Sequence, residues 1–232
     1  MPNPMALVSI RRRTLLASLL AGATVCHLPR FAGAATAFVL PGEAENRRFS
    51  VSYGGDRIGA HTISFSAATG QTRITTEIDL VVKMLFFTLF AFHHRSVEIW
   101  RDGRLMSLTS ETAEHGETLH VTGAATPQGF RVVSKAGPFL AASGSLTSNS
   151  LWTSAVLDQD TLIDAQYGGV IGISVRKLAD EQIALAGGPI RATRYRFVTP
   201  YLAGSIWYDD SGRWVHGEFE RDGAQIQYRL EV

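Results

Sequence analysis

The stretch of this sequence best suited to chemistry places aromatic, imidazole, hydroxyl and carboxylate side chains at every second position. These residues are Phe90, Phe92, His94, Ser96, Glu98 and Trp100, and Phe86 continues the same spacing toward the N-terminus. In a β-strand, alternate residues share one face and follow each other at roughly 6.6–6.8 Å. The side chains would therefore form a continuous strip. A histidine titrates near neutral pH, so with a nearby carboxylate it could hold a polar headgroup or act as an acid–base pair.

The N-terminal half of this stretch, residues 85–92, is apolar on both of its expected faces. Such a strand must be covered on both sides, or it must contact a ligand, a partner or lipid. We expect an apolar site with a polar end, lined by Phe86, Phe90, Phe92, His94, Ser96, Glu98, Trp100 and Trp152. The alternative is a central strand that the core covers on one side and residues 148–158 cover on the other.

Other chemistries find little support in the residue spacing. The sequence has no Gly-x-Ser-x-Gly elbow, no phosphate-binding Gly-Lys-Ser/Thr loop and no dinucleotide fingerprint. After residue 35 there is no cysteine, and the histidines form no His-x-His or His-x3-His pair. We therefore expect no catalytic residue set, no cofactor and no metal site, with an acid–base strip of His94 and Glu98 as an alternative.

Residues 1–35 have the layout of an export signal. Three arginines at 11–13 precede an uncharged stretch at 14–28, and Ala32-Gly33-Ala34 offers a small-x-small cleavage pattern. Residues 12–16 resemble the twin-arginine motif, which favours that export route over the general one. The uncharged stretch is shorter than the roughly 20 residues that span a bilayer. We expect cleavage near Ala34/Ala35, a periplasmic location and no transmembrane span afterwards.

Loss of this segment changes the charge of the chain. Four of the 22 basic residues lie in residues 1–34, which contain none of the 21 acidic residues, so the mature chain is net acidic. This does not fit the basic surface of a nucleic-acid binder. The only cysteine, Cys26, lies within the signal, so the mature chain uses neither a thiol nucleophile nor a disulfide.

Residues 36–232 predict β-strands almost throughout. Alternation is clearest over residues 72–83, and Asp-Gly or Gly-Gly turns separate successive strands. We count about 11 strands at short spacing, which predicts a single all-β domain. The expected fold is a mainly antiparallel, curved meander that forms a half-barrel or barrel. One short helix is expected within residues 148–158, after a small and polar loop at 141–150 that crosses over the sheet.

Aromatic and Asp-Gly motifs recur along this predicted sheet. They are Glu77-Ile78-Asp79, Lys83, Phe90, His94-Arg95-Ser96, Glu98, Trp100, Asp102-Gly103-Arg104-Leu105, Ser150-Leu151-Trp152, Trp207-Tyr208-Asp209 and Gly212-Arg213-Trp214-Val215. Together they resemble a family of exported bacterial proteins, the domain-of-unknown-function family 6134, over residues 49–232. The resemblance implies a periplasmic β-rich protein, and it brings no established reaction, substrate or catalytic residue.

These observations predict a non-catalytic periplasmic module that binds an apolar or amphipathic, lipid-like ligand. Burial of a ten-carbon chain would contribute on the order of 8 kcal/mol before the costs of binding, at about 0.8 kcal/mol per CH₂. A modest pocket would therefore suffice. The alternatives are a cell-envelope scaffold whose apolar strand docks a partner protein, and an enzyme that uses His94 and Glu98.

Overall fold

The computed structural model describes residues 40–41, 45–84, 87–221 and 223–231. The predicted export signal and Phe86 lie outside these ranges, so both remain predictions.

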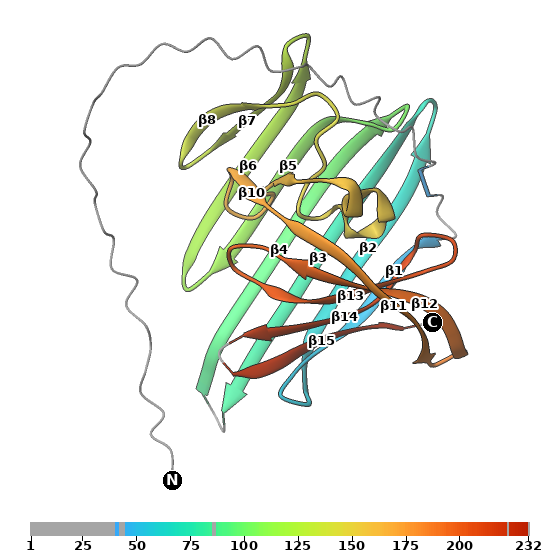
Figure 1. The fold of residues 1–232 in the computed structure, drawn as a ribbon. Helices are drawn as coiled ribbons and strands as arrows, with labels where there is room; N and C mark the ends of the chain where they lie inside the picture. The colour runs from blue at the N-terminus through green and yellow to red at the C-terminus, as the bar shows by residue number, and fades with distance from the viewer. Residues whose placement is uncertain (1–39, 42–44, 85–86, 222, 232) are drawn as a thin grey trace, which may run out of the picture. The chain divides into compact units, whose positions relative to one another are not determined.

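Thirteen antiparallel strands of the described chain form one large curved sheet (Figure 1). The strands are β1 (Arg47–Tyr53), β2 (Asp56–Ala68), β3 (Gln71–Met84), β4 (Phe87–Arg101), β5 (Arg104–Glu114), β6 (Glu117–Thr126), β7 (Gly129–Ser134), β8 (Gly137–Ala141), β11 (Ser174–Leu185), β12 (Gly188–Val198), β13 (Ala203–Asp209), β14 (Trp214–Arg221) and β15 (Ala224–Glu231). Two meanders, β1 to β8 and β11 to β15, join through the pairing of β1 with β15. In the described chain β8 and β11 are the two edges, so the sheet is a half-barrel and does not close.

A crossover segment, residues 142–173, connects β8 to β11 and covers one face of the sheet. It contains two 3-10 helices, η2 (Ser150–Trp152) and η3 (Ser154–Asp158), and a small two-stranded sheet of β9 (Thr161–Ile163) and β10 (Val170–Gly172). We call the face that this segment covers the inner face and the opposite one the outer face. Figure 1 shows the crossover lying in front of β2 to β5.

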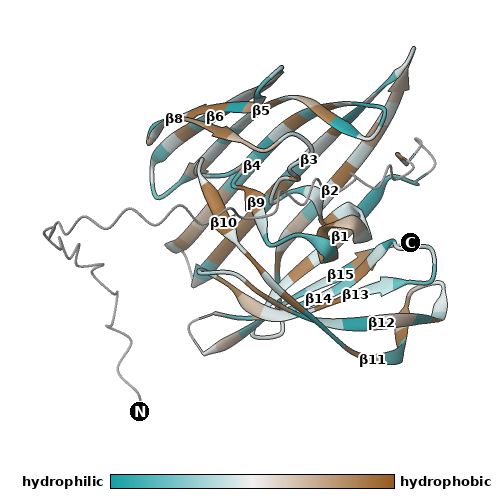
Figure 2. Cartoon of the chain, turned by 45° about the horizontal axis from the view of Figure 1, so that its top comes forward, coloured by the Kyte–Doolittle hydropathy of each residue, from teal (hydrophilic) through white to brown (hydrophobic). Residues whose placement is uncertain are grey.

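The two faces differ because the strands alternate. In β3, Ile74 and Ile78 are buried on the inner face, whereas Arg73, Glu77 and Asp79 are exposed on the outer face. Figure 2 shows apolar and polar residues following one another along these strands. The sheet therefore has one face that needs cover and one that water can solvate.

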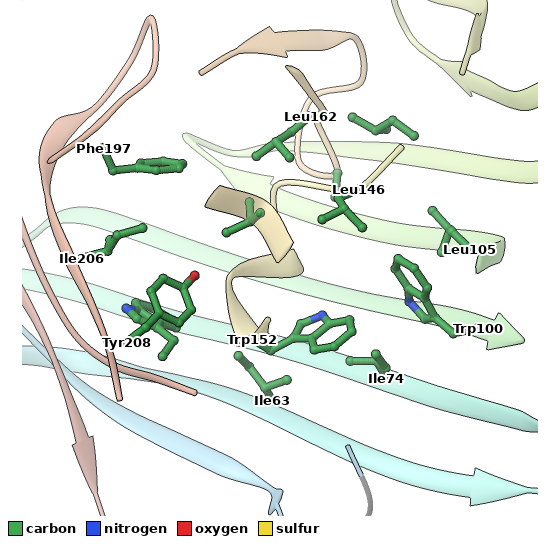
Figure 3. Packing of buried hydrophobic residues seen from close by; sticks show 14 of the residues in the cluster. Ile63, Ile74, Trp100, Leu105, Leu146, Trp152, Leu162, Phe197, Ile206 and Tyr208 are labelled. Carbon is green, nitrogen blue, oxygen red and sulfur yellow. The ribbon is translucent and has the colours of Figure 1, made fainter. Parts of the chain in front are cut away.

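The main core lies between the inner face and the crossover. The Trp152 ring lies 5.7 Å from the Trp100 ring and 5.8 Å from the Phe65 ring, both edge-on. Figure 3 shows Trp152 among Ile63, Ile74 and Trp100. A buried cation fixes this contact, since Arg47 Nη1 donates to the Trp152 carbonyl at 2.5 Å and its guanidinium lies 5.6 Å from the Phe65 ring. Burial lowers the pKa of Arg47 to about 10.

The fold confirms the predicted curved antiparallel meander, and it differs from the prediction in three details. The described chain has fifteen strands where about 11 were expected, and β8 and the short strand β9 are among those not predicted. The segment that crosses over the sheet is longer than the expected loop at 141–150 and runs over residues 142–173. The short helix expected within residues 148–158 is two 3-10 helices, η2 and η3.

At Gly59 the packing of the sheet leaves no space for a side chain. The register between β1 and β2 shifts just after Val51, whose partner is Gly59, and a Cβ added there would collide with the carbonyl oxygen of Asp79. Gly59→Ala should therefore lower the free energy of unfolding by about 1–3 kcal/mol, the usual range for overpacking. Gly172→Ala is the matched control, because an added Cβ there meets no described atom within 4 Å. Urea unfolding measures both, and equal stabilities would contradict this account.

Candidate functional site

The structure brings the predicted strip together on the inner face of β4. Phe92, His94, Ser96, Glu98 and Trp100 are all buried, and Phe90 is half-buried. The intervening residues such as His93 and Arg95 are exposed on the outer face. Trp152 joins the strip from the crossover through its ring contact with Trp100.

The polar part of the strip is hydrogen-bonded to the crossover. The Asn149 amide nitrogen lies 2.7 Å from Ser96 Oγ and 3.1 Å from His94 Nε2. His94 Nδ1 lies 2.8 Å from Thr112 Oγ1, which itself donates to the Gln166 carbonyl at 3.0 Å. Because an amide N–H can only donate, His94 Nε2 accepts and Nδ1 carries the proton. The imidazole is neutral in this arrangement, and burial lowers its pKa to about 4.

Glu98 is a buried carboxyl group held by two neutral donors. Thr147 Oγ1 donates to its Oε1 at 2.5 Å and Trp100 Nε1 donates to its Oε2 at 2.8 Å. Within the described residues it forms no salt bridge. Burial therefore dominates and raises the pKa of Glu98, while the two hydrogen bonds lower it to a smaller extent.

In this structure the polar residues of the strip bind the protein's own crossover segment. Thr147 and Asn149 occupy the positions that a ligand headgroup would take beside His94, Ser96 and Glu98. The alternative in which residues 148–158 cover this strand therefore describes the polar half of the strip. A role of these residues in holding a ligand, or in acid–base chemistry, would require the crossover to move and remains a prediction.

The apolar end of the strip has a different environment. In the described chain β4 pairs with β5 only from Phe92 onward, so residues 87–91 pair with β3 alone. Leu80, Val82 and Phe90 are half-buried on the inner face, and Leu89 on the outer face is 56% exposed. The strand end thus keeps apolar surface on both faces, as its sequence predicts.

A hollow of about 370 Å³ lies beside this projecting strand end. Its walls are β4 residues 88–91 together with His93, and residues 113–118 of the β5–β6 turn. A second hollow of about 300 Å³ lies near the opposite ends of these strands, and its lining includes Leu105 and Phe130, which are buried core residues. The first hollow is the better candidate for a ligand, because the exposed Leu89 and the half-buried Phe90 line it.

His61 is a second buried histidine of the inner face, which the sequence analysis did not single out. It lies on the inner face of β2 between Phe49 and Ile78, and Ile78 in turn lies beside His94. Its ring packs against those of Phe49, Trp214 and Tyr228, with centroids 5.9, 5.5 and 6.0 Å away. The alternation of His61 with the apolar residues 63 and 65 could have placed it on the inner face.

The His61 imidazole is buried without hydrogen bonds. Neither ring nitrogen has a partner among the described residues, and the side chain is 4% exposed. A buried polar group left unsatisfied costs about 1–3 kcal/mol, so this position calls for an explanation. Burial, and secondarily the nearby His94, lower the pKa of His61 to about 3, so the ring is neutral.

The described chain was also compared with the requirements of a metal site and of a membrane-spanning helix. Within it, no group of three or more His, Cys, Asp or Glu side chains is arranged to hold a metal ion. None of its helices has the length and apolar character needed to cross a membrane.

The fold and site together define a barrel-like β protein whose inner face is covered by its own crossover segment. The chain belongs to the family described as domain of unknown function DUF6134, which it matches over residues 49–231. This confirms the resemblance carried by the aromatic and Asp-Gly motifs.

The comparison with solved structures agrees with the fold. The chain is similar to a beta-barrel-like protein of domain of unknown function DUF1849 from Brucella abortus, with a TM-score of 0.57 and 9% sequence identity. The match covers 80% of this chain and 94% of that protein. At this identity the likeness shows the fold alone. No curated protein matches the chain.

The raised pKa of Glu98 predicts a loss of stability on the alkaline side. The folded protein holds this proton to a higher pH than the unfolded chain, whose carboxyl titrates near 4.5. As pH rises from that value through the folded pKa, the folding equilibrium should weaken by up to about tenfold per pH unit. Glu98→Gln should remove this loss, because its amide oxygen can accept from Trp100 Nε1 and its amide nitrogen can donate to Thr147 Oγ1, which reverses that bond. Chemical denaturation at pH 5–8 measures the free energy of unfolding of the wild type and of Glu98→Gln, with exposed Glu111→Gln as the control. Parallel pH profiles for the wild type and Glu98→Gln would refute the prediction.

The lowered pKa of His94 predicts an opposite trend on the acid side. An unfolded histidine titrates near 6.5 and folded His94 near 4, so the unfolded chain takes up the proton first. Stability should therefore fall between pH 6.5 and 4, approaching a tenfold change per pH unit for this residue. His94→Gln should reduce the slope by one proton relative to the wild type. The free energy of unfolding is measured across this pH range, and equal pH slopes for the wild type and His94→Gln would exclude this role of His94.

Proposed function

We propose that this protein is a periplasmic, non-catalytic module that binds an amphipathic, lipid-like ligand at the apolar end of the β3–β4 hairpin. The observation that carries the proposal is the projecting end of β4. It leaves Leu89 exposed on the outer face and Phe90 half-buried on the inner face, beside a hollow of about 370 Å³. The periplasmic location rests on the export signal predicted for residues 1–35.

The hollow has the size and lining that this class of ligand needs. Small-molecule sites commonly measure about 300–1,000 Å³ and combine apolar walls with a few polar groups. Leu89, Phe90 and Ala91 supply the apolar wall, and the β5–β6 turn supplies polar residues including Glu114 and His115. The His115 ring lies 5.8 Å from the Phe90 ring, so polar and apolar walls meet at this point.

The two rival functions receive less support from the same geometry. An enzyme based on His94 and Glu98 would have its two groups buried under the crossover, each bonded to a different partner. A scaffold protein could use the exposed end of β4 to dock another protein. Binding of a small amphipathic probe separates the ligand-binding function from the scaffold function.

The test is binding of dodecanol and dodecanoic acid to the purified protein, followed by native mass spectrometry and by displacement of a fluorescent fatty-acid probe. Leu89→Asp should weaken binding at least tenfold, because it places a charge in the apolar wall. Leu140→Asp is the matched control, since Leu140 in β8 is also 56% exposed and does not line the hollow. Equal affinities for the two variants, or no binding by the wild type, would rule the proposal out.

A further inference from the structure

We infer that His61 is the polar anchor of this ligand site and hydrogen-bonds the uncharged hydroxyl or carboxyl end of the ligand. The inference rests on the proposed function and adds to it the residue that recognises the ligand's polar end.

The first argument is the contrast between the two buried histidines of the inner face. Asn149 and Thr112 satisfy both nitrogens of His94. In the described chain neither nitrogen of His61 has a partner, although the ring is 4% exposed. An evolved core usually satisfies such a group, so the missing partner points to a molecule that the chain itself does not supply.

The second argument is the position of His61 relative to the apolar surface. The register pairs His61 with Ile78, and the next inner-face residues of β3 toward the hairpin end are Leu80 and Val82. Leu80 pairs with Phe92 and Val82 pairs with Phe90. An apolar track therefore begins next to His61 and ends at Phe90, a residue that also lines the hollow.

The length of this track suits a fatty chain. Val82 lies four residues along the strand from the partner of His61, and β3 is the strand next to β2. With about 3.3 Å per residue and about 4.8 Å between strands, the track measures roughly 14 Å to Val82 and about 16 Å to Phe90. A medium-length acyl or alkyl chain would lie along it with its polar end at His61 and its tip at Phe90, beside the hollow.

The surroundings of His61 select an uncharged polar group. The rings of Phe49, Trp214 and Tyr228 enclose the imidazole, and a bare charge is costly in such apolar surroundings. A neutral imidazole offers one donor and one acceptor, which matches a hydroxyl or a protonated carboxyl group. The half-buried Tyr228 and Leu80 are the side chains that would move to admit it.

The decisive variant is His61→Phe, tested in the purified protein with dodecanol as the probe. It keeps an aromatic ring in the aromatic enclosure and removes the two unsatisfied nitrogens. We expect the affinity for dodecanol to fall at least about tenfold. We also expect the midpoint of thermal unfolding to rise by roughly 2–4 °C, because a ligand-binding polar group reduces the stability of the empty protein. His120→Phe, at an exposed position, should change neither quantity.

Three outcomes are distinguishable. Weaker binding together with a higher unfolding midpoint supports the inference. Unchanged affinity in His61→Phe, with binding still lost in Leu89→Asp, overturns the role of His61 and leaves the proposed function standing. No binding of dodecanol by the wild type overturns both.

A second measurement covers the case in which His61→Phe folds poorly. His61→Leu removes the nitrogens with a smaller side chain, and the ring-nitrogen NMR signals of His61 in the wild type can be followed as dodecanol is added. Signals that stay unchanged while the protein saturates with dodecanol would overturn the inference.

Discussion

The crossover stays on the inner face because a hydrogen-bonded layer holds it there. Asn149 bridges His94 and Ser96, and Thr147 binds Glu98. Each of these groups is buried, so breaking one contact would leave its partner without water or protein to bond. The layer therefore fixes the position of the whole connection between the two meanders. It also keeps the inner face filled over the polar half of β4.

The same layer divides the inner face into two parts. Over residues 94–100 of β4 the chain satisfies its own polar groups and packs Trp152 over them. Toward the β3–β4 turn the crossover contributes no such partners among the described contacts, and the apolar residues Leu80, Val82 and Phe90 stay half-buried. His61 lies where the two parts meet. This division leaves the apolar end of the inner face less covered than its polar half.

The sequence predicted the features that depend on neighbouring residues. Alternation placed Phe92, His94 and Glu98 on one buried face, and the turn residues indicated most of the strands. It could not predict Asn149 as the partner of His94, because the two residues are 55 positions apart and only the path of the crossover brings them together. The unsatisfied nitrogens of His61 are likewise visible only after three distant aromatic residues are in place.

The pairing of β1 with β15 has a consequence for how the protein is made. Arg48 and Glu231 are neighbours in the sheet although 183 residues separate them along the chain. β1 therefore gains its second neighbour, β15, only after the end of the chain has been synthesised. The sheet cannot be completed strand by strand as the chain emerges from the ribosome. Non-local pairing of this kind slows folding. The complete sheet therefore forms only once the last strand has been synthesised.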